Sequence, residues 1–200
     1  MYGLPTSIKI GTKNYKIRNN GDFRAILDCF SFFQNSELDE RHRTIAALIA
    51  FYDGLTFENF YTYFDRDVNI CTSAQNEMYN FINCYQKTNP NRKNYKLYDW
   101  DEDEQLIFSA INQVAGYEVR TINAYCHWFT FMGYFNQIGE GAFSTVVAIR
   151  KKIIEHSKLD KWEQKFKNEN PHYFMWNSKT KAQQDREKEI MSLWNKGGAK

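Results

Sequence analysis

Two adjacent residues in the middle of the chain, Cys126 and His127, carry the side chains of a nucleophile and its general base. They lie in the stretch YCHWFTFMGYF, residues 125–135, in which six of eleven residues are Phe, Trp or Tyr. The spacing of these rings predicts a helix, and sequence neighbours on a helix point about 100° apart. Cys126 and His127 would therefore not face each other. We expect no catalytic residue and a protein that is not an enzyme.

A run of carboxylates, DWDEDE at residues 99–104, could hold a divalent metal or form an acidic docking patch. It lacks the alternate ligands and the central glycine of a calcium loop. The simpler interpretation is that Asp99 caps a helix and that Asp101, Glu102 and Asp103 lie in its first turn, where acidic side chains favour the helix dipole. The remaining histidines have no metal-binding spacing. We expect no metal and no cofactor.

The aromatic stretch predicts a helix from about Thr121 to Gln137 that is apolar nearly all round, which is typical of a central, buried helix. Trp128 should then be buried. A stripe of small residues along it predicts that another helix comes close at Gly133; its members are Asn123, Cys126, Thr130, Gly133 and Gln137. The alternative is that the rings form a hydrophobic surface for a client protein, although large exposed apolar patches are uncommon on monomers.

The elements that must position these residues are mostly helices. Apolar residues alternate only in the first eighteen residues, on either side of GTKN, which predicts a β-hairpin. Helical periodicity dominates the rest, with Asp22 as an N-cap, Ser36, Asp39 and Glu40 suited to the start of a second helix, and Gly116 as a C-cap. The sequence predicts a mainly α protein, a multi-helix bundle with a small N-terminal β-hairpin. Its expected organisation is a hairpin-plus-helix region (1–86), a linker or exposed loop (87–96) and a helical region (97–200).

The charge pattern restricts the class of partner. The formal net charge of the chain is only +2, but residues 142–200 carry 13 basic and 7 acidic side chains. A solvated helical face is the simpler interpretation of this basic end, and an anionic partner is the alternative. The first residues lack the layout of a signal peptide, and no stretch is apolar enough to span a membrane. Four scattered cysteines without a CxxC pair are typical of reduced thiols in a cytoplasm.

Several motifs occur in an order that resembles the bacteriophage gene-product-fifteen family of long-tailed phages that infect Gram-positive hosts. The matching positions cover most of the chain up to about residue 170. They are Leu4-Pro5, Ile17-Arg18, Asp22-Phe23-Arg24, Asp99, Trp100 and Asp103, His127 and Trp128, Phe131, and Arg150. The chain departs from the pattern in having Phe129 where the family often has a second Trp, and the segment from NPHYFMW onward matches no firm pattern.

This resemblance implies a protein of the tail-morphogenesis module, similar to tail assembly chaperones. Such a protein would bind the phage tape-measure protein, together with a companion tail chaperone or a tail-tube protein, in the host cell cytoplasm. It would leave before the tail is complete and be absent from the mature virion. The resemblance carries over no catalytic residue. We also expect no membrane partner, because no stretch is apolar enough. A homo-oligomer stays open.

A chaperone for a long amphipathic helix should offer apolar grooves or rings. The best candidates are aromatic residues beside irregular segments, where rings are less often fully buried. They form two clusters: Tyr95, Tyr98 and Trp100, and Tyr173, Phe174 and Trp176. The alternative is that each cluster only fastens its loop to the helical body.

Two alternatives to a chaperone function belong to other classes of protein. A permanent structural tail component would remain in purified virions. A nucleic-acid-binding helical protein, which the low net charge disfavours, would use the basic region with Trp162, Trp176 and Trp194 and would bind in a salt-sensitive way.

Overall fold

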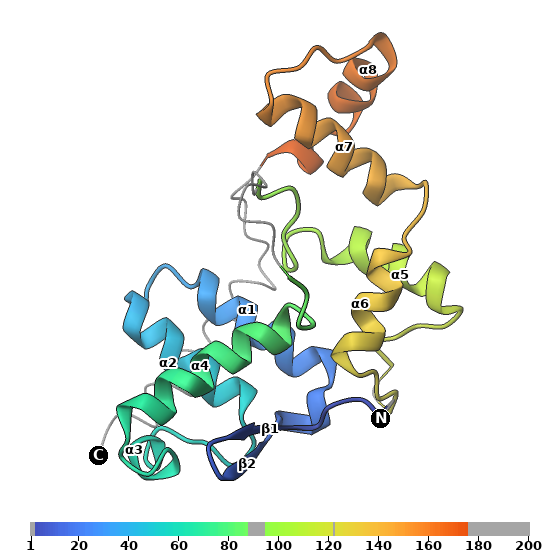
Figure 1. Cartoon of the computed structure of the whole chain (residues 1–200). Helices are drawn as coiled ribbons and strands as arrows, with labels where there is room; N and C mark the ends of the chain where they lie inside the picture. The colour runs from blue at the N-terminus through green and yellow to red at the C-terminus, as the bar shows by residue number, and fades with distance from the viewer. Residues whose placement is uncertain (1–2, 88–94, 122, 176–200) are drawn as a thin grey trace. The chain divides into compact units, whose positions relative to one another are not determined.

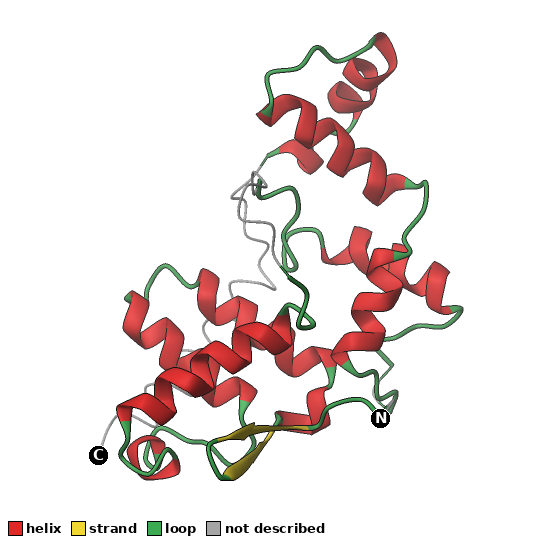
Figure 2. Ribbon diagram, in the orientation of Figure 1, coloured by secondary structure: helices red, strands yellow, loops and turns green. Residues whose placement is uncertain are grey.

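The computed structural model describes residues 3–87, 95–121 and 123–175 of the 200-residue chain. Eight α-helices and one two-stranded sheet lie in this part (Figures 1 and 2), which confirms a mainly α protein with a small N-terminal hairpin. The chain forms two compact units. Of the described residues, the first unit holds 3–87 and 125–131, and the second holds the rest. The boundaries predicted at 86 and 97 stay predictions, because most of the proposed linker lies outside the described residues.

The hairpin has one buried and one exposed face. Ile8 pairs with Tyr15 across the two antiparallel strands, and both side chains are buried with Ile10 while their neighbours are exposed. Gly11, at a φ of +59°, lies in the turn. The strands are β1 (Ser7–Ile10) and β2 (Lys13–Lys16). The predicted alternation is therefore confirmed, and it turns three large side chains toward the helices.

The helices of the first unit are η1 (Arg18–Gly21), α1 (Phe23–Gln34), α2 (Glu40–Phe51), α3 (Phe60–Tyr63) and α4 (Val68–Ile82), followed by the start of α6 (Trp128–Asn136). The predicted N-cap Asp22 is confirmed, since it accepts a hydrogen bond from the backbone N–H of Arg24. Of the residues expected at the start of the second helix, Asp39 is the cap and accepts a hydrogen bond from the backbone N–H of His42. Figure 1 shows α1, α2 and α4 side by side.

Arg18 fastens the end of the hairpin to the end of α2. Its guanidinium donates hydrogen bonds to the backbone carbonyls of Ile49 (2.7 Å) and Ala50 (3.0 Å), which are otherwise unsatisfied at a helix C-terminus. One residue beyond α2, the hydroxyl of Tyr52 donates to the carbonyl of Ala74 in α4 at 2.8 Å. These bonds fix α2 against both the hairpin and α4.

The aromatic helix is shorter than predicted. It begins at Trp128 and ends at Asn136, so the prediction of a helix from Thr121 to Gln137 is wrong at its N-terminal end. His127 instead forms an antiparallel bridge with Asp22, and the backbone N–H of Phe23 donates to the carbonyl of Cys126 at 3.0 Å. Partners from the start of the chain thus take the backbone bonds that a longer helix would have used.

Gly133 is not a close-approach site. A β-carbon built there would meet no atom of the described residues within 4 Å, so the predicted neighbouring helix is not found there. The small-residue stripe fails because its first members, Asn123 and Cys126, precede the helix and share no face with Gly133.

The helices of the second unit are α5 (Glu104–Ala115), the last residues of α6, α7 (Ala142–Ile154), α8 (Lys161–Glu169) and η2 (Pro171–Phe174). The apolar faces of α5 and α7 pack together, with Ile107, Ile111, Val146 and Ile149 buried. Gly116, at a φ of +78°, ends α5 as predicted.

Trp128 is buried as predicted, with only 1% of its surface exposed, and its indole N–H donates to the carbonyl of Ile82 at 2.8 Å. We expect Trp128→Ala to lower the free energy of unfolding by about 3–5 kcal/mol, since it leaves a cavity and an unpaired carbonyl. Urea unfolding measures the loss. Trp162→Ala is the matched control, because Trp162 is 58% exposed; equal losses for the two variants would contradict the assignment.

Candidate functional site

Cys126 and His127 belong to a structural junction within the first unit. The backbone N–H of Cys126 donates to the carboxylate of Asp22 at 3.1 Å, and its thiol lies 3.8 Å from the carbonyl oxygen of His127. Both side chains are buried. The backbone here is extended, so the helical geometry we expected for the pair is wrong, and the junction with Asp22 gives both residues a structural role.

Both ring nitrogens of His127 have backbone partners. Nδ1 accepts from the N–H of Phe129 at 3.1 Å, so Nε2 carries the proton and donates to the carbonyl of Pro5 at 3.0 Å. Burial lowers the pKa of His127, although the Pro5 carbonyl and the Asp22 carboxylate oppose this shift. The imidazole is therefore held neutral, with no nitrogen left to accept a proton from a thiol.

Gly21 makes room for the His127 ring. A β-carbon at position 21 would come within 2.8 Å of Nε2 of His127 and 3.2 Å of the Phe81 ring, and the backbone has a φ of +79°. Both facts favour glycine at this position.

The residues that carried the family resemblance in the first half of the chain converge on this junction. Phe23 stacks on Phe131 with ring centroids 4.4 Å apart, and Arg24 pairs with the Asp22 carboxylate. Since Pro5, His127 and Trp128 belong to the same set of motifs, the resemblance rests largely on side chains that hold the first unit together.

The second half of the motif set forms another buried cluster, within the second unit. Arg150 makes a bidentate ion pair with Asp103, with N–O distances of 2.6 and 2.9 Å, and both side chains are buried. The guanidinium also donates to the backbone carbonyls of Leu97 and Tyr173. One cation thus holds together α7, the start of α5 and η2.

Asp99 caps a turn before α5 and not the helix itself, which begins at Glu104. Its carboxylate accepts the N–H groups of Asp101 and Glu102. Burial alone would raise the pKa of Asp99, but Lys96 and these two N–H groups outweigh it and hold the pKa below its usual value. Two carboxylates of the acidic run therefore have partners within the protein: Asp99 caps a turn, and Asp103 pairs with Arg150.

The first predicted client cluster is mostly inside the protein. Trp100 is only 7% exposed and packs against Phe135, with centroids 5.1 Å apart, while Tyr98 contacts both Phe135 and Phe143. Tyr95 and Tyr98 are half-buried. The expectation that a ring beside this irregular segment is accessible is therefore wrong for Trp100, because Phe135 of α6, which lies far along the chain, covers it.

The second predicted cluster extends into an exposed apolar surface. Tyr173 and Phe174 are half-buried, and Trp176 lies outside the described residues. Phe174 contacts Phe166 of α8, which stacks on Trp162 at a centroid distance of 5.4 Å. Trp162 is 58% and Met175 64% exposed. We call Trp162, Phe166, Phe174 and Met175 the aromatic face.

Local bonds fix the orientation of the aromatic face. Asp160 and Glu163 form a reciprocal capping box that starts α8. Glu163 also pairs with Lys152 of α7, and Arg150 holds the carbonyl of Tyr173 in η2. Sequence reasoning missed Trp162 and Phe166 as members of this surface. The available signal was their spacing, four residues apart on a helix that is otherwise rich in lysine and glutamate.

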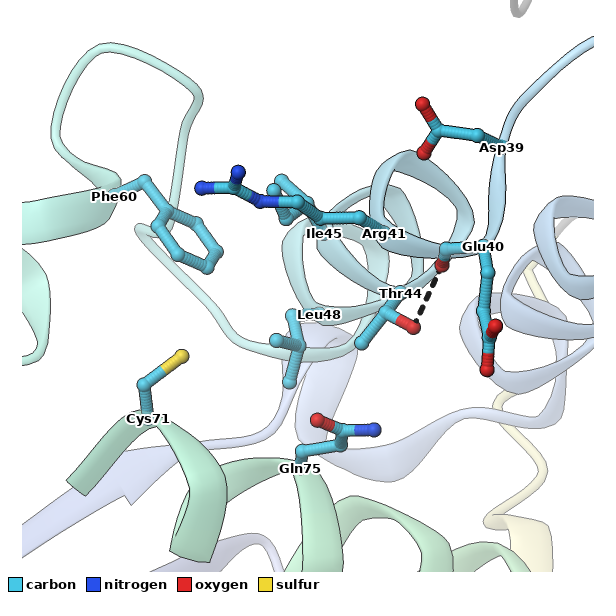
Figure 3. Close-up of a pocket in the computed structure, with 9 residues that line it drawn as sticks. All are labelled: Asp39, Glu40, Arg41, Thr44, Ile45, Leu48, Phe60, Cys71 and Gln75. Carbon is cyan, nitrogen blue, oxygen red and sulfur yellow. Dashed lines mark hydrogen bonds between the residues drawn. The ribbon is translucent and has the colours of Figure 1, made fainter. Parts of the chain in front are cut away.

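A second accessible feature is a groove in the first unit, between α2 and α4 (Figure 3). Its volume is about 550 Å³. A smaller cavity of about 320 Å³ lies between α5 and the start of α7. Within residues 3–87, 95–121 and 123–175, no three His, Cys, Asp or Glu side chains gather as a metal ion would require. No helix in the same residues is long and apolar enough to cross a membrane.

The model of the family described as "Bacteriophage Gp15 protein" matches residues 2–173. This chain belongs to that family. The match covers both motif clusters and ends at η2, which confirms the resemblance found in the sequence and its extent. No curated protein and no solved structure matches the chain. Family membership identifies the Gp15 protein as a phage protein.

The buried imidazole of His127 should make stability pH-dependent. Its pKa is below 6.5 when folded, so as pH falls through about 6.5 the unfolded chain takes up a proton before the folded one does. The stabilisation that the neutral His127 contributes is therefore complete above this pH and is lost as the pH falls below it. The test measures the unfolding free energy of both the wild type and His127→Gln between pH 6.5 and 5. As the pH is lowered, the wild type should lose up to about 1.4 kcal/mol per pH unit more than the variant loses. Parallel stability curves would contradict this.

The Arg150–Asp103 pair should behave as a coupled unit. Arg150→Met leaves a buried carboxylate without its partner and is expected to cost about 3–5 kcal/mol. Adding Asp103→Asn removes the orphaned charge, so the double variant should be more stable than the sum of the two single losses by at least about 1 kcal/mol. A double-mutant cycle from denaturant unfolding measures this coupling, and strict additivity would refute it.

Proposed function

We propose that this Gp15 protein is a non-enzymatic tail assembly chaperone that binds the tape-measure protein during tail morphogenesis. It acts in the host cell cytoplasm and leaves before the virion is complete. The aromatic face is the client-binding surface. The observation that carries this proposal is the exposure of a stacked Trp162–Phe166 pair on a short, highly charged helix.

A purely structural role explains only part of the aromatic face. Phe166 and Phe174 are half-buried and fasten η2 to α8, as a staple would. Trp162 lies at the other side of Phe166 and leaves more than half of its surface in water. Burying the rest of such a ring against a partner would yield about 1–3 kcal/mol, which is typical of a binding hot spot.

The shape and charge of the aromatic face suit an amphipathic helix. Trp162 and Phe166 form a stripe along α8 into which a helical ridge can pack, and Phe174 and Met175 extend it sideways. The exposed Lys161 and Lys165 flank the stripe. Acidic residues beside the apolar face of the client would therefore be favoured. In this proposal, the uncoated tape measure is a long helix of this kind.

The alternative functions predict different binding behaviour for the aromatic face and a different composition of the virion. A nucleic acid would stack on Trp162 but depend on the lysines, so its binding would weaken steeply with salt. Apolar burial is screened far less, so client binding should survive moderate salt. A permanent tail component would be found in purified virions, whereas a chaperone is absent from them.

Trp162→Ala should impair client binding without unfolding the protein. Co-expression with the tape-measure protein of the same phage, followed by a pull-down, measures the recovery of soluble tape measure. We expect recovery to fall about tenfold, the equivalent of a 1–2 kcal/mol anchor, with little change in melting temperature.

Tyr61→Ala is the matched control, since Tyr61 is 68% exposed on α3 of the first unit and is not part of the aromatic face. It should support the client as well as the wild type. The site assignment fails if Trp162→Ala recovers as much tape measure as the control, and the proposed function fails if the tape measure is equally soluble without this protein.

A further inference from the structure

The one buried side chain of α8 is a charged one. Glu163 is 8% exposed, and every other side chain from Lys161 to Glu169 is exposed or half-buried. A helix this short is marginal by itself, because isolated helices of fewer than about 12–15 residues are barely stable in water. Most short helices offset this by burying an apolar face, which α8 does not do. It therefore depends on the contacts of Glu163 and of the half-buried Phe166.

The carboxylate of Glu163 has two functions. Its Oε2 accepts the backbone N–H of Asp160 at 2.9 Å, which closes the capping box at the start of α8. Its Oε1 accepts a hydrogen bond from the ammonium group of Lys152 in α7 at 2.5 Å. The side chain of Glu163 is 11% exposed and that of Lys152 is 41% exposed, so solvent screens the pair only in part. One carboxylate thus couples the formation of α8 to its attachment to α7.

The aromatic face has two parts that are held in different ways. Trp162 and Phe166 meet because they are four residues apart on a helix, so their stack exists only while α8 is helical. Phe174 lies in η2, where the buried Arg150 holds the carbonyl of Tyr173. Phe166 reaches Phe174 through one edge-to-face contact with ring centroids 6.4 Å apart. Undocking of α8 would therefore dismantle the Trp162–Phe166 stack and leave η2 in place.

We infer that the Lys152–Glu163 ion pair is a latch that controls whether α8 is docked. While the latch is closed, α8 is helical and attached to α7. When it opens, α8 unfolds locally, and α5, α7 and η2 stay folded. Local opening of this kind is typical of a segment with few buried apolar contacts.

The regulatory consequence of the latch rests on the proposed function. The latch sets the fraction of molecules that present the complete aromatic face to the client, and the apparent affinity for the client falls in proportion to that fraction. Regulation of the client surface thus lies in α7, on a residue that is not part of the aromatic face.

Lys152→Met tests the latch from the α7 side and leaves the sequence of α8 and its capping box intact. Met keeps an unbranched apolar stem but carries no charge. Lys151→Met is the matched control, because Lys151 is the exposed neighbour of Lys152 and forms no ion pair within the described residues. Lys152→Arg retains a cation at the same position and is the rescue variant.

Amide hydrogen exchange of the free, full-length protein measures the opening of α8 without any client. We expect residues 161–169 to exchange about tenfold faster in Lys152→Met than in the wild type, the effect of losing one charge-assisted hydrogen bond. Exchange in α5 and α7 and the melting temperature should stay nearly unchanged, and Lys151→Met and Lys152→Arg should behave as the wild type. Equal exchange in α8 for Lys152→Met and Lys151→Met, or acceleration spread evenly over α5 and α7, would overturn the latch.

Recovery of soluble tape-measure protein on co-expression tests the regulatory consequence. With about 10% of wild-type molecules undocked, a tenfold larger opening constant leaves about half of them docked, so Lys152→Met should recover about twofold less than Lys152→Arg. Lys152→Glu, which adds repulsion from Glu163, should recover less still. Equal recovery for Lys152→Met and Lys152→Arg, despite faster exchange in α8, would refute the regulatory role. A tape measure that is equally soluble without this protein would instead refute the proposed function, and the exchange result would still decide the latch.

Discussion

Asp22 makes the contacts on which the first unit depends. One of its carboxylate oxygens caps α1 through the N–H of Arg24, and the other accepts the N–H of Cys126, more than one hundred residues along the chain. Closing so long a loop has an entropic cost that grows only slowly with loop length, but it must be offset by local contacts. The bridge to His127, the stack of Phe23 on Phe131 and the bond from Trp128 to Ile82 supply those contacts. The segment 125–131 thereby becomes part of a unit that is otherwise built from the first 87 residues.

Arg150 has the corresponding role in the second unit. A buried ion pair contributes little net stability, because both charges lose their hydration, but it specifies which groups must meet. Here the guanidinium satisfies Asp103 and two backbone carbonyls from separate segments. Its bond to Tyr173 fixes η2, and η2 carries Phe174 of the aromatic face. The motif residues of this family thus make buried contacts that stabilise each unit. The proposed client surface lies on residues outside those motifs.

Local sequence signals predicted what depends on local interactions. The alternation around Ile8 and Tyr15, the N-cap at Asp22 and the C-cap at Gly116 were all found. The features that were not predicted depend on contacts between residues that are far apart in the sequence. Residues 125–127 have the ring spacing of a helix but bond to the N-terminal segment. Trp100 follows an irregular stretch but is buried against Phe135 and Tyr98. Of the predicted client residues, Phe174 lies on the aromatic face, whereas Trp162 was overlooked because a lysine-rich helix suggested a solvated surface.

The central claim is that this phage protein works by offering the aromatic face to an apolar helix. Amide hydrogen exchange, compared between the free protein and its complex with the tape-measure protein, tests it most directly. The account predicts that protection on binding is concentrated in residues 161–174, with little change around Trp100 and His127. Protection centred on residues 95–100, or a stable complex without any protection in α8 and η2, would contradict it.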